Sequence, residues 1–376
     1  MSDFLQVLLI SIAASWTPVS QEAELVFAGD AMQHAAQIDA ARTPQGTYDY
    51  SECFATITPY VESADYAVVN LETPLSGAPF TGYPCFSAPD SYAECLKNAG
   101  FDLFLTANNH TLDRRNKGLK RTVSVLDSLE VDHIGTYTCD SVRERVIPFI
   151  KDINGFKIGF LNYTYGTNGF TPGENVIVDY IDTTLISRDI IATRNAGAEL
   201  ITVAIHWGDE YILTPNKTQK QLADFLTGKG VDMVIGSHPH VIQPIELRYS
   251  TNDSTQHPQL VAYSLGNFIS NMRTRDTRGG IMLKVKLKRD NDGFPFISEA
   301  KYKPVFTVPP LQGHNYRLVD ATEQVPDPTW DYHRKQFLQS AKAIFDKYNI
   351  RVEMDSASLN SIDPNLPPPL PQGARH

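Results

Sequence analysis

Five short apolar segments of the chain each end in side chains that can bind a metal ion or transfer a proton. They are Glu24–Asp30, Tyr66–Glu72, Phe101–His110, Glu199–Gly208 and Val231–His240. Runs of this length and apolarity predict buried β-strands, and predicted helices separate most of them. Because ligands in open α/β sheets bind beyond the carboxyl ends of the strands, we expect the polar side chains to gather at one site.

The last of these segments carries two histidines, His238 and His240, directly after the apolar run Val231–Ile235 and Gly236. If the backbone stays extended, a spacing of two residues places both imidazoles on one face. Pro239 between them fixes a backbone angle and removes a hydrogen-bond donor. The pattern predicts two neutral nitrogen ligands aimed at one point, and the alternative is a loop with two solvated histidines.

The order of the predicted elements indicates the fold class. Strands and helices alternate over the first two-thirds of the chain, and a helix is expected to start at Ala31–His34. Asn154-Gly155 predicts a hairpin that makes a sheet locally antiparallel. Predicted strands then follow one another from Val241 onward, before a last helix at Trp330–Tyr348. This order favours an α/β fold in which helices cover two central mixed sheets.

Composition excludes some classes of partner. The net charge of -10 and the pI of about 5.5 give no basic surplus for neutralising phosphates, which argues against a nucleic-acid partner and against a general affinity for anionic membranes. The four cysteines form no Cys-x-x-Cys pair, so a zinc finger is not expected. Their even number permits disulfides without requiring them, which leaves open the pairing of Cys53, Cys85, Cys95 and Cys139.

The N-terminus resembles a leader segment. Residues Phe4–Ala14 have the apolar character of a secretory signal, although no Lys or Arg precedes them, and they are too few to span a bilayer. We therefore expect residues 1–23 to direct export to the periplasm or cell envelope, with membrane association only through this end. The alternative is a buried N-terminal helix in a cytoplasmic protein.

The strand ends supply a mixed set of oxygen and nitrogen donors. Two carboxylates, one amide and three imidazoles suit zinc, manganese or iron better than magnesium or calcium alone. The six residues are Asp30, Glu72, Asn109, His206, His238 and His240. Since six donors exceed the need of one tetrahedral ion, we expect two divalent metal ions that share Glu72. Such a pair can orient a substrate oxygen and activate water, while His110 acts as general acid.

The motifs around these residues resemble those of one family. They are Phe27-Ala-Gly-Asp30, Asn70-Leu-Glu72, Ala107-Asn-Asn-His110 with Asp113, His206-Trp-Gly208, Gly236-Ser-His-Pro-His240 and Ser264-Leu-Gly-Asn-Phe268. Together they resemble the CapA family of poly-gamma-glutamate capsule synthesis proteins, a branch of the calcineurin-like metallophosphoesterases. The resemblance implies a four-layer αββα sandwich with a dinuclear metal site held by the six residues named above. It also implies that His110 is the catalytic histidine and that Asp113 orients it.

The resemblance covers about residues 24–285, and the sequence departs from the wider superfamily at two places. We expect the CapA-like domain at residues 24–310, a helical extension at 311–354 and a disordered tail at 355–376. Met32 stands where phosphoesterases in general carry a histidine, so His34 is a further candidate ligand. Glu72 likewise replaces a more usual aspartate. Asn267 is expected to reach the site from behind the ligands.

Three functions fit this resemblance. The first is a metal-dependent hydrolase that acts on an anionic polymer of the cell surface or on a small-molecule precursor. The second is a non-hydrolytic accessory of capsule assembly that binds the polymer or a capsule synthase. The third is a metal-dependent peptide epimerase, in which the same groups remove and return a proton beside a carbonyl.

Overall fold

The computed structural model describes residues 21–249, 257–311 and 315–356. The predicted leader at residues 1–23 lies almost entirely outside the described residues, as does the tail from residue 357 onward. Among the described residues, no helix is both long and apolar enough to cross a bilayer.

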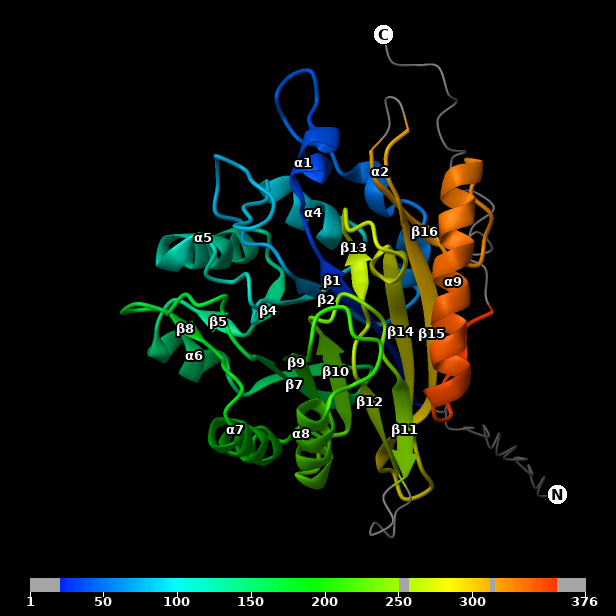
Figure 1. Cartoon of the computed structure of the whole chain (residues 1–376). Helices are drawn as coiled ribbons and strands as arrows, with labels where there is room; N and C mark the ends of the chain where they lie inside the picture. The colour runs from blue at the N-terminus through cyan, green and yellow to red at the C-terminus, as the bar shows by residue number, and fades with distance from the viewer. Residues whose placement is uncertain (1–20, 250–256, 312–314, 357–376) are drawn as a thin grey trace, which may run out of the picture.

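Two β-sheets form the centre of the molecule (Figure 1). The first contains a path ordered β16-β15-β14-β1-β2-β3-β4, with β13 paired to β1 and β17 paired to β15. Its strands are β1 (Glu22–Ala31), β2 (Tyr66–Leu71), β3 (Leu103–Leu105), β4 (Asp132–Ile134), β13 (Asn267–Ile269), β14 (Gly279–Arg289), β15 (Pro295–Val308), β16 (Arg317–Asp320) and β17 (Glu353–Met354). Strands β1 to β4 are mutually parallel, and β14 to β16 are antiparallel.

The second sheet has the order β11-β12-β10-β9-β7-β6. Its strands are β6 (Phe149–Ile153), β7 (Phe156–Thr164), β9 (Leu200–His206), β10 (Met233–Ser237), β11 (Ile245–Tyr249) and β12 (Pro258–Ala262). The hairpin predicted at Asn154-Gly155 is confirmed, because β6 and β7 pair antiparallel across it. A separate two-stranded ribbon joins β5 (Thr136–Tyr137) and β8 (Ile177–Val178).

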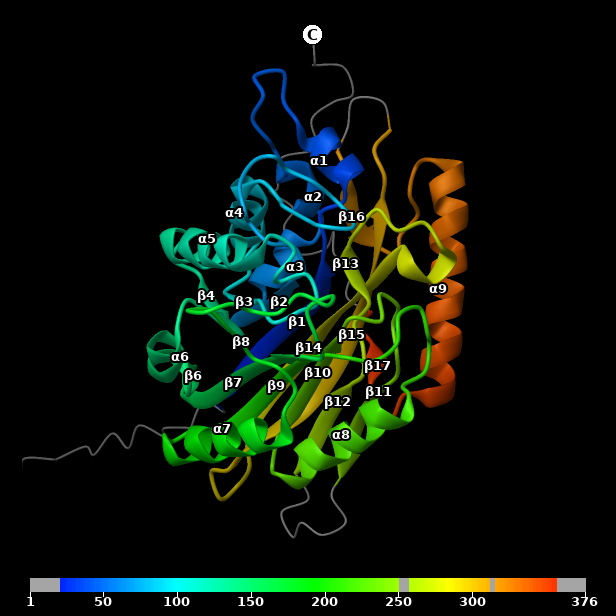
Figure 2. The ribbon, with the colours of Figure 1, turned by 60° about the vertical axis from the view of Figure 1, so that its left-hand side comes forward.

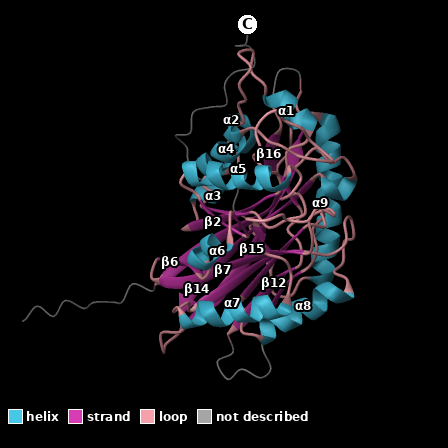
Figure 3. Ribbon diagram, turned by 90° about the vertical axis from the view of Figure 1, so that its left-hand side faces the viewer, coloured by secondary structure: helices cyan, strands magenta, loops and turns pink. Residues whose placement is uncertain are grey.

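Helices cover the outer face of each sheet, as Figures 2 and 3 show. The first sheet is covered by α2 (Ser51–Phe54), α3 (Thr58–Glu62), α4 (Asp90–Asn98) and α5 (Arg115–Ser128). The second is covered by α7 (Thr183–Asn195) and α8 (Lys217–Gly228). The remaining helices are α1 (Ala35–Ala41), α6 (Asp140–Val146), the short 3-10 helix η1 (Arg275–Thr277) and α9 (Pro328–Tyr348), which packs beside β15. The predicted four-layer sandwich is therefore confirmed.

Strand β1 shows why the chain folds into layers. Its alternate side chains Leu25 and Phe27 belong to the core between the two sheets. Val26 and Ala28 belong instead to the core beneath α2 to α5. A strand that is apolar on both faces is typical of a parallel sheet covered on both sides. The layering thus follows directly from the continuous apolar run that ends at Asp30.

The helix predicted to start at Ala31–His34 begins later. Strand β1 continues through Ala31 because Asp30 and Ala31 pair with Asn267 and Ile269 of β13. His34 then becomes the N-cap of α1, with an extended backbone. The prediction was wrong because the pairing partner lies more than two hundred residues away in the sequence.

All four cysteines are free thiols in the structure. Cys53 is buried, and Cys85, Cys95 and Cys139 are partly exposed. The sequence left the disulfide state open, and the structure shows no disulfide bond among the described residues.

Gly236 is required where β10 meets the segment after β12. A Cβ atom at this position would lie 2.0 Å from the backbone oxygen of Tyr263. We therefore expect Gly236→Ala to destabilise the fold by about 3 kcal/mol, since neither backbone can move freely. Chemical denaturation should measure the loss. Gly228→Ala in α8 is the matched control: it meets no atom within 4 Å, so stability should stay the same or rise slightly. Equal stability of the two variants would contradict the packing argument.

Candidate metal centre

The carboxyl ends of β1, β2, β9 and β10 bring five of the six predicted ligands together. Asp30 and Glu72 come from the first sheet, and His206, His238 and His240 come from the second. Two groups of donor atoms result, in each of which the atoms lie within 4.8 Å of one another. One group is Glu72, His238 and His240, and the other is Asp30, Glu72 and His206. Glu72 belongs to both.

Asn109 adjoins the second group. Its Oδ1 lies 2.9 Å from Nε2 of His206, and the same nitrogen lies 3.7 Å from Oε1 of Glu72. The amide oxygen therefore faces the same point as the histidine and the carboxylate. Asn109 is thus placed where the sequence predicted it.

The two histidines after β10 reach the site by an unexpected backbone path. Strand β10 ends at Ser237, and both His238 and His240 have positive φ, at 98° and 55°. The segment is therefore not extended, although both imidazoles still come together with Glu72. Positive φ is costly for residues other than glycine, by about 1–3 kcal/mol each, and such strain concentrates at functional sites.

Burial keeps the imidazoles neutral. Burial is the main cause that lowers the pKa of His238, to about 3, and it lowers the pKa of His206 well below its usual value. Neighbouring histidines lower both further. A neutral imidazole offers a free lone pair, which is the form that binds a metal ion.

Glu72 is buried beside a second carboxylate. Burial, and after it the charge of Asp30, raises the pKa of Glu72 well above its usual value. Among the described residues, no Lys or Arg nitrogen lies within 4.0 Å of either carboxylate. Buried charges need a counter-charge, so the geometry calls for cations at this point.

Two buried atoms of the cluster have no hydrogen-bond partner in the part of the chain that the structure describes. They are Oε1 of Glu72 and Nδ1 of His238. Buried polar atoms are nearly always bonded, and an unsatisfied one requires an explanation. The donor set therefore fits divalent metal ions, because an ion would satisfy both the unpartnered atoms and the buried charge.

Other side chains hold the ligands in place. Nδ1 of His240 lies 3.0 Å from Oδ1 of Asn267, whose amide group donates to the backbone oxygen of Thr277. Nδ1 of His206 lies 2.8 Å from the Ser237 hydroxyl. Such partners fix the ring orientation of a ligating histidine. Asn267 thus lies where the sequence expected it, and Ser237 was missed although it immediately precedes His238.

Asn70 is a second residue that the sequence analysis missed. Its Nδ2 donates to Oδ1 of Asp30, at 2.9 Å, and to Oε2 of Glu72, at 3.3 Å. It therefore bridges the two carboxylates. The available signal was the alternation of a strand, since residues 70 and 72 share one face.

His110 and Asp113 form a buried pair beside the cluster. Nδ1 of His110 lies 2.8 Å from Oδ2 of Asp113, and the same oxygen accepts the backbone N–H of Phe86 at 2.7 Å. The ring of Phe86 packs edge-on against the imidazole, with the centroids 4.6 Å apart. The carboxylate fixes the proton on Nδ1, which leaves Nε2 for proton transfer.

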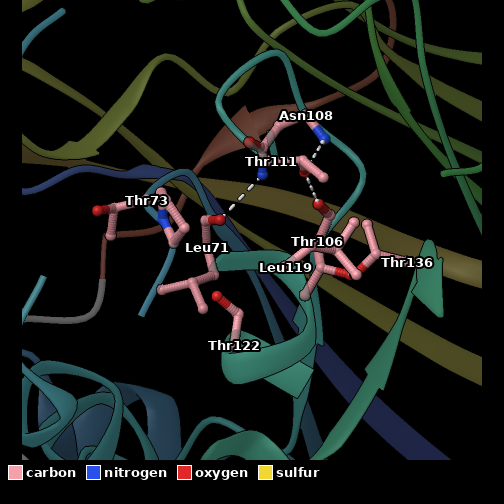
Figure 4. A pocket seen from close by; sticks show the side chains of 9 residues that line it. Leu71, Thr73, Thr106, Asn108, Thr111, Leu119, Thr122 and Thr136 are labelled. Carbon is pink, nitrogen blue, oxygen red and sulfur yellow. Dashed lines mark hydrogen bonds between the residues drawn. The ribbon is translucent and has the colours of Figure 1, made fainter. Parts of the chain in front are cut away.

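Hydrogen bonds hold the loop that carries Asn109 and His110, and Figure 4 shows those made by its residues Asn108 and Thr111. Asn108 donates from Nδ2 to the backbone oxygen of Leu71 at 2.9 Å, and the Thr111 hydroxyl donates to the oxygen of Thr106. A cavity of about 10 Å³ lies beside these residues and is also lined by Thr73. This volume holds about one water molecule. The hydrogen bonds of Asn108 and Thr111 therefore fix the backbone of this loop.

His34 lies outside both groups of donor atoms. Its Nδ1 lies 3.2 Å from Oε1 of Gln37 and 3.3 Å from the backbone nitrogen of Asn271. Burial lowers its pKa to about 4. The structure thus places His34 at the edge of the site, where it contacts the segment after β13.

Two tyrosines that were not predicted lie over the histidines. The ring centroid of Tyr165, which is 48% exposed, lies 4.5 Å from that of His238. Tyr211, which is 53% exposed, lies 6.2 Å from His240. They form the solvent-facing side of the cluster.

Comparisons with known proteins place the chain among capsule synthesis proteins. The sequence model described as "Bacterial capsule synthesis protein PGA_cap" matches residues 24–272. The chain is 26% identical to "Capsule biosynthesis protein CapA" of Bacillus anthracis over 332 residues, which cover 80% of this chain and 76% of that protein. It is 28% identical to "PGA biosynthesis protein CapA" of Bacillus subtilis (strain 168) over 250 residues, which cover 64% of this chain and 62% of that protein.

Solved structures show weaker similarity. A Haemophilus influenzae NAD nucleotidase aligns at 12% identity with a TM-score of 0.47, covering 89% of this chain and 57% of that one. A 5'-nucleotidase from Candida albicans SC5314 aligns at 11% identity with a TM-score of 0.40, and the alignment covers 72% of this chain and 52% of that one.

Proposed function

The chain belongs to the bacterial capsule synthesis protein family PGA_cap, and from this premise we propose that it is a metal-dependent hydrolase acting on an anionic cell-surface polymer or its precursor. One observation carries the proposal. Glu72 is shared by two groups of buried donor atoms, and the pair of His110 and Asp113 lies alongside them. A shared carboxylate is typical of two-metal hydrolytic sites.

We assign the donors to two divalent ions. Asp30, Glu72, Asn109 and His206 would hold one ion, and Glu72, His238 and His240 would hold the other. The mixture of carboxylate, amide and imidazole donors favours zinc, manganese or iron. When bound, such ions supply Lewis acidity toward a substrate oxygen and lower the pKa of water.

The residues of the chain then have distinct tasks. His110 is the proton donor to the leaving group, because its Nδ1 is held by Asp113 and its Nε2 remains free for proton transfer. Asn267 and Ser237 keep the rings of His240 and His206 oriented. Asn70 positions the carboxylates.

The substrate class follows from the relatives. Their names place them in the biosynthesis of the capsule and of PGA. We therefore propose that this protein acts in the cell envelope on poly-gamma-glutamate or a similar anionic chain, after export, and that a capsule synthase is a candidate partner.

Metal analysis combined with a phosphoester assay tests this proposal. Wild-type protein should bind two equivalents of metal and hydrolyse a generic phosphodiester or phosphomonoester slowly. His238→Ala removes a donor from only one of the two groups, so it should retain about one equivalent and lose most of the turnover. The matched control is His133→Ala, since His133 pairs with Asp127 far from the cluster.

Each outcome separates the candidate functions. Metal bound without turnover on these esters would favour either a hydrolase that accepts only its polymer or the epimerase, which exchange of label into peptide α-carbons in heavy water would reveal. Polymer binding without any metal would contradict the hydrolase and favour the accessory role in capsule assembly.

A further inference from the structure

Three arginines surround one pocket outside the metal centre. The pocket has a volume of about 240 Å³ and lies between the segment after β13 and the first turns of α9, where Figure 2 shows η1 beside that helix. Its lining residues are Arg273, Arg275, Arg278, Tyr332, His333 and Gln336. A concentration of positive charge of this kind is unexpected on a chain with a net charge of -10.

Two of the arginines have no acidic partner. Arg275 makes a bidentate ion pair with Asp276, with both N–O distances at 2.8 Å. Among the described residues, no carboxylate oxygen lies within 4.0 Å of a guanidinium nitrogen of Arg273 or Arg278. Arg273 lies close enough to Tyr316 to oppose the rise that burial causes in the pKa of this tyrosine. Their charges are therefore available to a ligand.

Arg278 is held in place rather than free to turn. Its Nε donates to the backbone oxygen of Arg273 at 2.9 Å, and its guanidinium lies 5.4 Å from the centroid of Trp330. Burial, and after it the charge of Arg273, lowers the pKa of Arg278. Burial and Arg278 likewise lower the pKa of His333. An anion in the pocket would relieve this repulsion, and a fixed guanidinium fork suits a carboxylate.

The pocket is linked to the metal centre by one short segment. This segment starts at Asn267, which bonds to His240, and passes Asn271, whose backbone N–H donates to His34. Asn271 also accepts the hydroxyl of Tyr316, the tyrosine that Arg273 contacts. The six residue steps from Asn267 to Arg273 span at most about 22 Å. An extended polymer of comparable length could reach both places.

We propose that Arg273, Arg278 and His333 form a subsite for a carboxylate of the polymer, several units away from the bond that lies at the metal centre. This inference rests on the proposed function in taking the substrate to be a polycarboxylate. The subsite would hold the chain in register and favour long substrates over short ones. Arg275 contributes little, because Asp276 already neutralises it.

Binding measurements on chelator-treated protein test the subsite without requiring turnover. The probe is a fluorescent γ-linked glutamate oligomer of about ten units, long enough to span both places, measured by anisotropy. The double variant R273Q/R278Q should bind it about tenfold more weakly or worse, because two charge-assisted contacts are lost. The charge-matched control R145Q/R188Q, on α6 and α7, should bind like wild type, and R275Q should change binding less than the double variant. Unchanged melting temperatures establish that all variants are folded.

The outcomes distinguish this inference from the proposed function. Unchanged oligomer binding by R273Q/R278Q, with metal-dependent turnover intact in wild type, would overturn the subsite alone. Weakened binding without any turnover in wild type would support the subsite and count against the hydrolase. Tighter binding of polyphosphate than of the glutamate oligomer at matched charge would overturn the carboxylate assignment.

Discussion

Replacing Glu72 with glutamine is expected to release metal from both groups of donors at once and to abolish metal-dependent turnover. Glu72 is the one residue common to the two groups. Loss of an outer partner of a ligand weakens metal binding by about 10- to 100-fold, so loss of a shared ligand should exceed this. Elemental analysis and the phosphoester assay on the same sample measure both effects.

A stability measurement separates a ligand from a structural residue. Glutamine keeps the shape of Glu72 and can accept the amide hydrogen bond of Asn70, but it has no charge to bury beside Asp30. We therefore expect the metal-free E72Q protein to be at least as stable as the metal-free wild type. The control E144Q changes an exposed acid on α6, outside the cluster, and should keep two equivalents of metal. An E72Q protein that keeps its metal, or that unfolds without it, would contradict the shared-ligand assignment.

Replacing His110 with glutamine is expected to lower kcat by about 10²- to 10⁴-fold, the usual contribution of a general acid. The metal content should not change, because His110 belongs to neither group of donors. The loss should be large for an ester with a poor leaving group and small for a nitrophenyl ester, whose leaving group needs no proton.

A variant of Asp113, the carboxylate beside His110, can be compared with H110Q in the same assay. D113N removes the negative charge of the acceptor that holds Nδ1 of His110, so it should give the same leaving-group dependence with a smaller loss. Equal losses on both esters, or loss of metal from H110Q, would show that His110 is not the proton donor.

The strand ends could be predicted because their signal is local. Asp30, Glu72 and His206 follow apolar runs that can only be buried strands, and parallel strands bring such ends to one edge. Asn267 was also placed correctly behind the ligands. The features that the sequence did not predict depend on contacts between residues far apart in the sequence. The backbone turns at His238 and His240 arise from packing that their sequence spacing does not encode.

The arginine pocket illustrates the same limit. Arg273 and His333 are separated by sixty residues and meet only because α9 packs beside η1 and β15. Asn70, by contrast, stood two positions before a predicted ligand on the same strand. Strict use of strand alternation would have found it.

The split of the donors between two sheets has a consequence for how the protein matures. Asp30 and Glu72 belong to one sheet, whereas His206, His238 and His240 belong to the other. The nascent chain therefore contains no preformed binding site, and ion capture must follow the docking of the two halves. Since the available metal pool strongly affects which ion a site of this kind takes, the compartment where docking finishes would select the ion for the proposed site. An ion bound there would crosslink the halves and resist their separation.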